Sequence, residues 1–250
     1  MTIPIDISEE SGIRYLHFGS EWVQGAMRIR KPDALELDYT REMMAGLLLR
    51  DAAWPKRVLL IGLGAGSLAK FIHRHLPEAH STVVEIAPEV HAVARQFFKL
   101  PDEDERLQIV IGDGADFVTQ DTRQWDLIAV DGFDRHARAG ALATQPFYEA
   151  CRARLSDRGL LAVNLFGQLR GFKTQVQRLG KAFEGRVLAL PELESGNVVA
   201  FGAVGEPVES SLAELRVRAA SLKAATGLDL TPTLRRLEKS GVLSDGRLGF

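Results

Sequence analysis

The sequence predicts an α/β fold, with a mostly parallel seven-stranded sheet and a small β unit before it. Three observations indicate this fold: short continuous apolar runs, helical segments that alternate with them, and glycine or acidic residues directly after the first four runs. Continuous apolar runs are typical of strands that are buried on both faces. Strands that alternate with helices form βαβ units with right-handed crossovers, which makes the sheet parallel.

The N-terminal part, residues 1–37, is expected to form the small β unit. Residues 13–18 partly alternate between apolar and polar, and residues 22–29 could pair with them in an antiparallel manner. The residues that follow, 38–50, carry an apolar face at helical spacing, which predicts a helix with Thr40 as its N-cap.

The segment 38–205 is expected to be the main domain. Its apolar runs predict parallel strands at residues 57–61, 81–86, 107–111, 126–130 and 160–165. Helical segments between them cover residues 67–76, 88–99, 115–119 and 145–155. Residues 186–190 and 197–204 predict two more strands at an antiparallel edge. The rest, residues 206–250, is expected to be a helical tail with helices at 212–224 and around 234–239 and a loose end at 244–250.

Composition excludes several classes of protein. One cysteine in 250 residues excludes a disulfide scaffold and a multi-cysteine zinc site, and fits a reducing cytoplasm. The formal net charge of −2 gives no positive field for nucleic acid. No apolar stretch approaches the ~18 residues that span a bilayer, and the acidic, proline-broken N-terminus is unlike a signal peptide. We therefore expect a cytoplasmic protein without a metal and without nucleic-acid or membrane partners.

A glycine-rich turn directly follows the first predicted strand and opens a helix. It contains Gly62, Gly64 and Gly66 in a GxGxG pattern. Glycines let the backbone turn sharply and approach a ligand, and the helix N-terminus favours the polar groups of that ligand. Glu85 ends the second strand, 23 residues after Gly62, where a carboxylate accepts hydrogen bonds from ribose hydroxyls.

Acidic residues also follow the third and fourth predicted strands. Asp113 lies in a Gly-Asp-Gly turn, where its carboxylate can accept from the exocyclic amine of adenine. Asp131 ends the fourth strand, and Asp134 comes three residues later. Because parallel strands bring their carboxyl ends to one edge, these acids predict a nucleoside site there. The glycine turn lacks a basic residue, which favours S-adenosylmethionine or its decarboxylated relative over a pyrophosphate.

Seven pieces of the sequence occur in the order typical of one family. They are YTREMM, RVLLIGLGAGSLAKF, VVEIAPEV, RLQIVIGDGADF, WDLIAVDGFD, PFYEACRARLSDRGLLAVN and LPELESGNVVAFG. On these pieces the sequence resembles the spermidine synthase family, the polyamine aminopropyltransferases, within the Rossmann-like class I methyltransferase fold. The resemblance implies aminopropyl transfer from decarboxylated S-adenosylmethionine to an amine acceptor such as putrescine, with release of methylthioadenosine, by a homodimer.

The resemblance also implies a role for each site residue. Asp131 would orient or deprotonate the attacking amine, and Asn164 is a further candidate for a substrate contact. Other substrate contacts would come from Asp134 and Gln24. Apart from the resemblance, Tyr148 is expected to pack in the core but could approach the acceptor. The nucleoside donor would be held by Gly62, Gly64, Gly66, Glu85, Ile86, Asp113 and Gly114.

The chain departs from the family pattern where the donor tail and the acceptor would bind. Ala65 stands where the family usually has an aspartate that contacts the donor's aminopropyl amine. The segment after Asp134 is basic, and would repel a polycationic acceptor; it contains Arg135, His136 and Arg138. Glu192 and Glu194 stand where the family often has tyrosines. Two alternatives stay open: an S-adenosylmethionine-dependent methyltransferase of the same fold, and a catalytically silent nucleoside-binding homologue.

Overall fold

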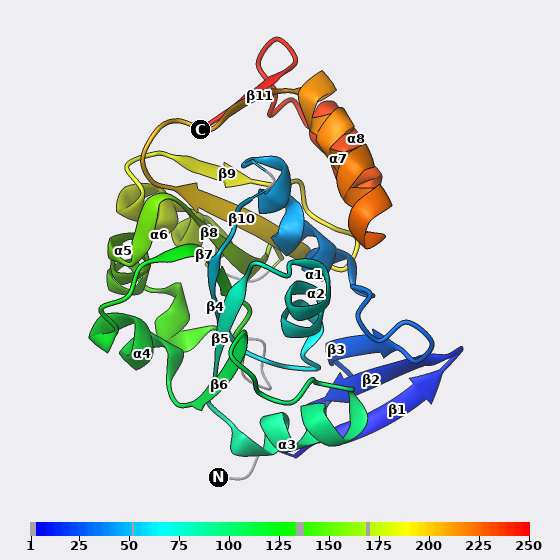
Figure 1. Cartoon of the computed structure of the whole chain (residues 1–250). Coiled ribbons are helices and arrows are strands. Elements are labelled where there is room, and N and C mark those ends of the chain that lie inside the picture. Colours follow the sequence, from blue (N-terminus) through cyan, green and yellow to red (C-terminus); the bar gives the residue numbers. More distant parts are fainter. Residues whose placement is uncertain (1–3, 52, 134–137, 169–170) are drawn as a thin grey trace.

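A twisted seven-stranded sheet forms the centre of the computed structural model, which describes residues 4–51, 53–133, 138–168 and 171–250 (Figure 1). The strand order is β6-β5-β4-β7-β8-β10-β9. All pairs from β6 to β8 are parallel, whereas β10 is antiparallel to both β8 and β9. The strands are β4 (Arg57–Ile61), β5 (His80–Glu85), β6 (Leu107–Ile111), β7 (Trp125–Val130), β8 (Leu155–Phe166), β9 (Val187–Ala189) and β10 (Asn197–Ala203). The predicted mostly parallel sheet is confirmed.

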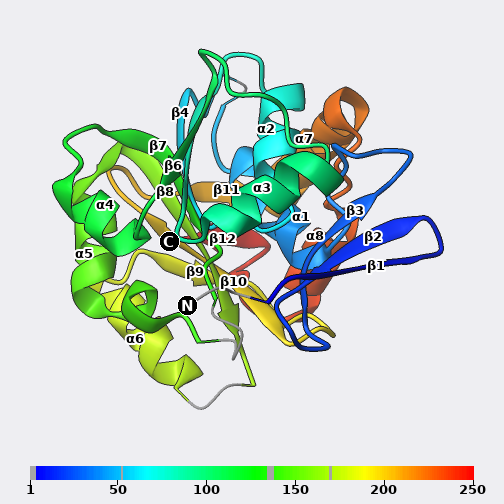
Figure 2. The same cartoon turned by 90° about the horizontal axis from the view of Figure 1, so that it is seen from below.

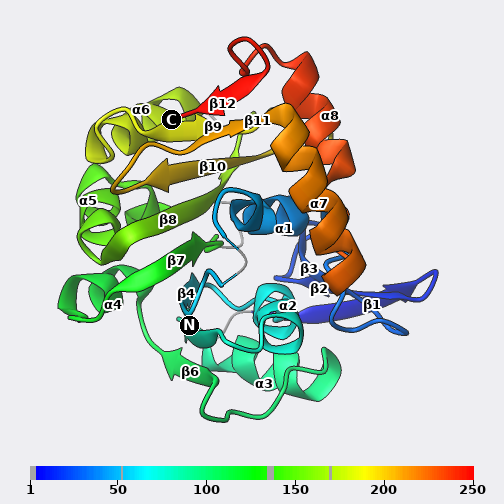
Figure 3. The ribbon, with the colours of Figure 1, turned by 45° about the horizontal axis from the view of Figure 1, so that its top comes forward.

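Helices cover both faces of this sheet, as Figure 2 and Figure 3 show. One face carries α1 (Asp38–Met43), α2 (Ser67–His75) and α3 (Pro88–Phe97), and the other α4 (Gly114–Gln120), α5 (Gln145–Ala153) and α6 (Phe172–Ala182). Successive residues of β4 enter different cores: Val58 and Leu60 pack on the α1–α3 side, Leu59 and Ile61 on the other. This explains the continuous apolar run, because side chains on a strand alternate between the two faces.

The N-terminal unit is a three-stranded antiparallel sheet that lies beside α2 and α3 (Figure 1). It consists of β1 (Asp6–Glu10), β2 (Ile13–His17) and β3 (Val23–Arg28). Strand β1 was not predicted, because its polar sequence DISEE carries no apolar alternation. β3 passes directly over the glycine turn: a Cβ on Gly25 would come within 2.6 Å of the Cβ of Ala65.

The segment after Val204 packs two helices and a small sheet onto the α1 side. Helices α7 (Leu212–Thr226) and α8 (Thr231–Lys239) lie on this side (Figure 1). Their buried leucines belong to the same core as the apolar residues of α1. Strand β12 (Arg247–Gly249) pairs with β11 (Glu209–Ser211), and Leu248 is buried. The expectation of a loose end at 244–250 is therefore wrong, because this pairing and the burial of Leu248 fix it. Arg236 of α8 also forms an ion pair with the buried Glu42 of α1.

Three further local features differ from the sequence-based expectations. The helix expected at 38–50 ends at Met43 and continues as the 3₁₀ helix η1 (Met44–Leu48). Thr40 is not its N-cap; its hydroxyl donates to the carbonyl of Leu37, and that residue takes the N-cap position. Helix α6 and the 3₁₀ helix η2 (Gly140–Ala143) were not predicted, although the apolar residues of α6 recur at helical spacing. No helix of the described segments is long and apolar enough to cross a membrane.

A lysine is enclosed in the core between α2 and α3. Lys70 is 1% exposed, and its Nζ donates a 2.7 Å hydrogen bond to the carbonyl of Phe98, next to the end of α3. Burial lowers the pKa of Lys70 to about 7, although the charge of Asp33 opposes this. A buried ammonium is costly unless it is compensated, and a neutral apolar side chain of similar volume often replaces it without loss.

We expect Lys70→Met to remove part of the pH dependence of stability. The pKa of Lys70 is about 7 in the folded protein, against 10.5 for an ordinary lysine. Between pH 7 and pH 10.5, Lys70 is therefore protonated in the unfolded chain and largely neutral in the folded one. The free energy of unfolding therefore rises with pH in this window, with a slope of up to about 1.4 kcal/mol per pH unit from Lys70 alone. Urea denaturation from pH 6 to 10 measures it. The exposed Lys56 gives the control Lys56→Met, which should leave the slope unchanged; a wild-type slope in Lys70→Met would contradict the expectation.

Candidate active site

Asp131 directly follows β7 and lies at the centre of a hydrogen-bonded group. Its Oδ2 accepts from the hydroxyl of Tyr39 at 3.1 Å, and its Oδ1 accepts from Nδ2 of Asn164 at 2.9 Å. The Oδ1 of Asn164 in turn accepts from Nδ2 of Asn197 at 2.9 Å, and the Oδ1 of Asn197 accepts from the Ser195 hydroxyl at 2.8 Å. One donor on each oxygen fixes the orientation of the Asp131 carboxylate.

The surroundings of Asp131 make it a better proton acceptor than an ordinary aspartate. Burial raises the pKa of Asp131, and the hydrogen bonds from Asn164 and Tyr39 offset only part of this rise. Burial and the charge of Asp131 raise the pKa of Tyr39 well above 10, so Tyr39 keeps its proton and acts as the donor in this pair. The arrangement can hold an amine and accept a proton from it.

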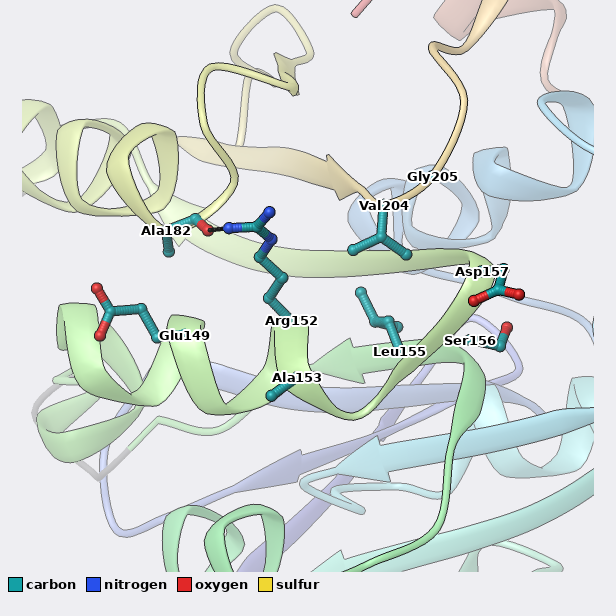
Figure 4. Close-up of a pocket in the computed structure, with 9 residues that line it drawn as sticks. All are labelled: Glu149, Arg152, Ala153, Leu155, Ser156, Asp157, Ala182, Val204 and Gly205. Atoms are coloured by element: carbon teal, nitrogen blue, oxygen red, sulfur yellow. Dashed lines mark hydrogen bonds between the residues drawn. The ribbon is translucent and has the colours of Figure 1, made fainter.

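A narrow cavity of about 20 Å³ connects Asp131 with the glycine turn and with β3. Gln24, Tyr39, Gly62, Gly64 and Asp131 all contribute to its wall. A larger hollow of about 480 Å³ lies at the opposite edge of the sheet, where β8 begins; Figure 4 shows Arg152 there, donating to the carbonyl of Ala182. None of the predicted site residues lines this larger hollow. Chemistry therefore places the candidate site at the carboxyl ends of the strands.

The glycine turn needs glycine because two other segments approach it closely. Gly62 has a φ of +94°, and a Cβ there would lie 2.1 Å from the carbonyl oxygen of Asp131. Gly64 has a φ of +51°, and its Cβ would lie 3.1 Å from the carbonyl oxygen of Gln24. Gly66, with a φ of +69°, is the N-cap of α2. The turn thus brings β3, the start of α2 and the end of β7 together.

Glu85, at the end of β5, holds the glycine turn in place. Its Oε2 accepts from the amide of Leu63 and its Oε1 from the amide of Ala87, both at 2.9 Å. Burial raises the pKa of Glu85, and the backbone hydrogen bonds offset part of this rise. Next to it, Ile86 is 64% exposed, and Ile111 on the neighbouring strand β6 is 45% exposed. Both isoleucines are exposed close to the carboxyl ends of their strands.

Asp113 and Gly114 connect β6 to α4. Asp113 is the N-cap of α4, and its Oδ1 accepts from the amides of Ala115 at 2.7 Å and Asp116 at 3.2 Å. Gly114 is buried, and a Cβ there would lie 2.4 Å from a methyl group of Ile61, so glycine permits α4 to pack closely on β4. Capping occupies one carboxylate oxygen of Asp113, and its side chain stays exposed.

A family model described as the spermine/spermidine synthase domain matches residues 37–186 of the chain. The chain belongs to this family. It is 41% identical, over 244 residues, to a protein from Chromobacterium violaceum named polyamine aminopropyltransferase; the match covers 98% of this chain and 93% of that protein. The resemblance to the spermidine synthase family is confirmed, and so is the expectation of a transferase.

Two solved structures in the spermidine synthase family have a similar fold. A probable spermidine synthase from Corynebacterium glutamicum has a TM-score of 0.72 and 21% identity, and the match covers 90% of this chain and 91% of that one. A spermidine synthase in complex with the transition-state analogue AdoDATO has a TM-score of 0.61 and 25% identity, with 81% and 74% covered. The predicted Rossmann-like class I methyltransferase fold is confirmed.

Ala65 replaces the usual family aspartate at a position that β3 closes. Its side chain is 2% exposed and lies against Gly25 of β3. A larger, charged side chain at this position would displace β3 from the glycine turn. The small side chain of Ala65 therefore fits the close packing of β3 on the glycine turn.

Tyr148 does not line the narrow cavity beside Asp131, and its predicted substrate contact stays a prediction. Its side chain is fully buried in the core under α5, next to Phe147 and Cys151. Asp134, Arg135 and His136 lie outside the described residues, and their expected contacts stay predictions. In the segments that the structure describes, no group of three or more His, Cys, Asp or Glu side chains could hold a metal ion.

Two residues of the site were not singled out from the sequence. Tyr39 belongs to the piece YTREMM and Asn197 to the piece LPELESGNVVAFG, so both lie within the pieces that resemble the family. Neither has a local pattern that identifies its partner. Tyr39 reaches Asp131 across 92 positions, and Asn197 reaches Asn164 across 33.

We expect Gly62→Ala to destabilise the protein by about 2 kcal/mol or more, because the new Cβ meets the Asp131 carbonyl and the positive φ adds strain. Chemical denaturation measures this. The matched control is Gly180→Ala in α6, where a Cβ has open space; it should stabilise by about 0.5–1 kcal/mol because alanine favours helix. Equal effects of the two changes would show that β4 and β7 do not approach as described.

Proposed function

We propose that the protein transfers the aminopropyl group of decarboxylated S-adenosylmethionine to an amine acceptor such as putrescine and releases methylthioadenosine. The observation that carries this proposal is the Asp131 carboxylate, held by Tyr39 and Asn164 beside the glycine turn. The 41% identity to a protein named polyamine aminopropyltransferase supports it. The AdoDATO complex of a structural neighbour supports a donor that contains adenosine.

The residues at the sheet edge fit the adenosine part of such a donor. Glu85 accepts backbone hydrogen bonds from Leu63 and Ala87, and a carboxylate can also accept from a ribose hydroxyl. Ile86 exposes an apolar side chain that suits the flat face of a base, and Asp113 has a carboxylate oxygen beyond its capping bonds. The donor set is therefore Gly62, Gly64, Gly66, Glu85, Ile86, Asp113 and Gly114.

Asp131 is the catalytic residue in this proposal. The acceptor nitrogen attacks the carbon of the aminopropyl group that is bonded to the sulfonium sulfur. The new C–N bond forms as this C–S bond breaks, and the electron pair of the C–S bond goes to sulfur. The nitrogen then releases a proton to Asp131. Since a sulfonium is already an activated leaving group, the protein mainly positions the two reactants, and the raised pKa of Asp131 helps the carboxylate accept the proton. Asn164 and Tyr39 keep the carboxylate oriented.

Further expectations remain proposals of the same kind. We assign Gln24, in the wall of the narrow cavity, and Asp134 to substrate contacts. We also propose a homodimer in the cytoplasm, with residues 1–37 as a β unit over the donor site, 38–205 as the catalytic domain and 206–250 as a supporting tail. The placement of β3 over the glycine turn supports the first part of this division.

One observation favours a second candidate, methyl transfer from intact S-adenosylmethionine. Ala65 offers no carboxylate to an aminopropyl amine, and β3 closes its position. The two candidates differ in the tail of the donor, so the by-product that binds best separates them.

We expect isothermal titration calorimetry to give at least about tenfold tighter binding of methylthioadenosine than of S-adenosylhomocysteine. Tighter binding of S-adenosylhomocysteine would support the methyltransferase instead, and binding of neither would indicate a silent homologue.

Asp113→Asn keeps a capping residue and should weaken methylthioadenosine binding several-fold. Asp116→Asn, at an exposed acid in the first turn of the same helix, is the matched control and should leave binding unchanged.

We expect the acid limb of the pH profile of kcat/KM to move to higher pH in Tyr39→Phe. The hydrogen bond from Tyr39 lowers the pKa of Asp131, so its loss raises that pKa and protonates the carboxylate at a higher pH. The ionisation of the acceptor amine is common to all variants, so the difference between profiles reports on Asp131.

Asp131→Asn should abolish turnover and keep methylthioadenosine affinity within about threefold. An active Asp131→Asn enzyme would remove Asp131 from the mechanism. The control for Tyr39→Phe is Tyr15→Phe, which removes a phenol hydroxyl on the N-terminal unit and should leave the pH profile unchanged.

A further inference from the structure

Helix α1 carries Tyr39, which donates to Asp131, but the helix is too short to fix its own position. It has six residues, and its N-cap Leu37 has an apolar side chain that cannot accept from the first amides. Helices of this length are marginal in isolation, so tertiary contacts must determine where they lie. The hydrogen bonds of Arg41 go to residues 35–38, at the start of the helix and directly before it. These bonds do not attach α1 to the rest of the fold.

A buried carboxylate on the same helix reaches the C-terminal tail, residues 206–250. Glu42 is 1% exposed, and its Oε1 accepts from Nη2 of Arg236 on α8 in an ion pair. Burial raises the pKa of Glu42, and contacts with Arg236 and Thr233 of α8 offset only part of this rise. The charge of Asp38, on α1 itself, raises the pKa further. Arg236 thus supplies the counter-charge that a buried carboxylate needs, and it ties α1 to α8.

A second arginine of the tail holds the segment that follows α1. Nη1 of Arg218, on α7, donates to the carbonyl of Leu48 at 2.8 Å, where η1 ends. Helix α7 packs on η1, and α1 packs on β8 and β10; Figure 3 shows α7 beside α1. The tail itself is fixed, because β11 pairs with β12 and leucines of α7 and α8 are buried in the core. The tail and the sheet therefore hold α1 and η1 from two sides.

We propose that Arg236 is a positioning residue for the reaction: its ion pair with Glu42 places α1 so that the Tyr39 hydroxyl reaches Asp131. This inference rests on the proposed function and adds a remote residue to it. Glu42 follows Tyr39 by three positions, so the two side chains are neighbours on the helix surface. A displacement of α1 at Glu42 therefore moves Tyr39 as well. The Tyr39 bond to Asp131 is already 3.1 Å long, so a small displacement is enough to break it.

The test compares Arg236→Met with Tyr39→Phe. We expect Arg236→Met to move the acid limb of the pH profile of kcat/KM to higher pH, as Tyr39→Phe does, by about 0.5 pH unit, which lowers kcat/KM on that limb about threefold. In the Tyr39→Phe background, Arg236→Met should add no further shift, because the hydrogen bond through which Arg236 acts is already absent. Arg236→Lys keeps the charge and should recover part of the shift. No shift in Arg236→Met, or one that adds to that of Tyr39→Phe, would overturn the proposal.

A purely structural role of the ion pair predicts a different result. Arg236→Met leaves a buried carboxylate unpaired and should lower the midpoint of thermal unfolding, so its profile is measured well below that midpoint. Glu42→Met with Arg236→Met replaces the pair by apolar side chains, which often preserves stability, but flexible methionines give no directional contact. This double variant should unfold near the wild-type midpoint and still show the shifted acid limb. A wild-type profile at wild-type stability would assign the pair to stability alone and overturn the proposal.

The matched control is Arg216→Met, which breaks the exposed ion pair between Arg216 of α7 and Glu238 of α8. It removes an arginine from the same two helices without touching α1, so the acid limb and the unfolding midpoint should stay as in the wild type. The affinity for methylthioadenosine should stay within about twofold in every variant, because the donor residues do not contact Arg236.

Hydrogen exchange separates failure of this inference from failure of the proposed function. The amides of residues 38–48 should exchange several-fold faster in Arg236→Met and in the double variant than in the wild type and in Arg216→Met. Unchanged exchange would overturn the hold of Arg236 on α1, whether or not the protein turns over an amine. A wild type that transfers no aminopropyl group would overturn the proposed function, and faster exchange in Arg236→Met would still identify Arg236 as the residue that positions α1.

Discussion

The rest of the site depends on the two hydrogen bonds that Tyr39 and Asn164 donate to the Asp131 carboxylate. It joins α1, the end of β7 and the end of β8 around one partly buried charge. Burial makes that charge unfavourable, and the two donors compensate it. The Asn164 amide is held in this orientation by Asn197. The Tyr39 hydroxyl keeps its proton, so it remains a hydrogen-bond donor to the carboxylate. A carboxylate fixed in this way can meet an incoming amine without reorganisation.

The geometry of Asp131 draws on segments outside the main sheet. β3 passes over the glycine turn with no room for a side chain at Gly25, so the N-terminal unit forms a wall of the cavity. On the other side, Arg236 of the C-terminal tail pairs with the buried Glu42 of α1, the helix that carries Tyr39. An unpaired buried carboxylate is strongly destabilising, so the tail keeps α1, and with it the donor to Asp131, against the sheet.

Several residues at this edge serve the fold and the site at once. Glu85 accepts from the glycine turn, Asp113 caps α4, and Gly62 permits the contact with the backbone of Asp131. These contacts place the polar groups before a ligand arrives, which reduces the cost of ordering them upon binding.

The sequence by itself determined the order of strands and helices from β4 to β10 apart from α6 and η2, and the turn that carries Gly62, because apolar runs, glycines and acids are local signals. It also placed Asp131 at a strand end. It missed β1, whose residues are polar, and it did not reveal that Tyr148, on helix α5, is fully buried among apolar side chains. Only the tertiary structure decided that Tyr39, Asn164 and Asn197 form one network with Asp131. Those contacts join residues 33 to 92 positions apart, and such pairings arise from the packing of whole elements, which no local pattern encodes.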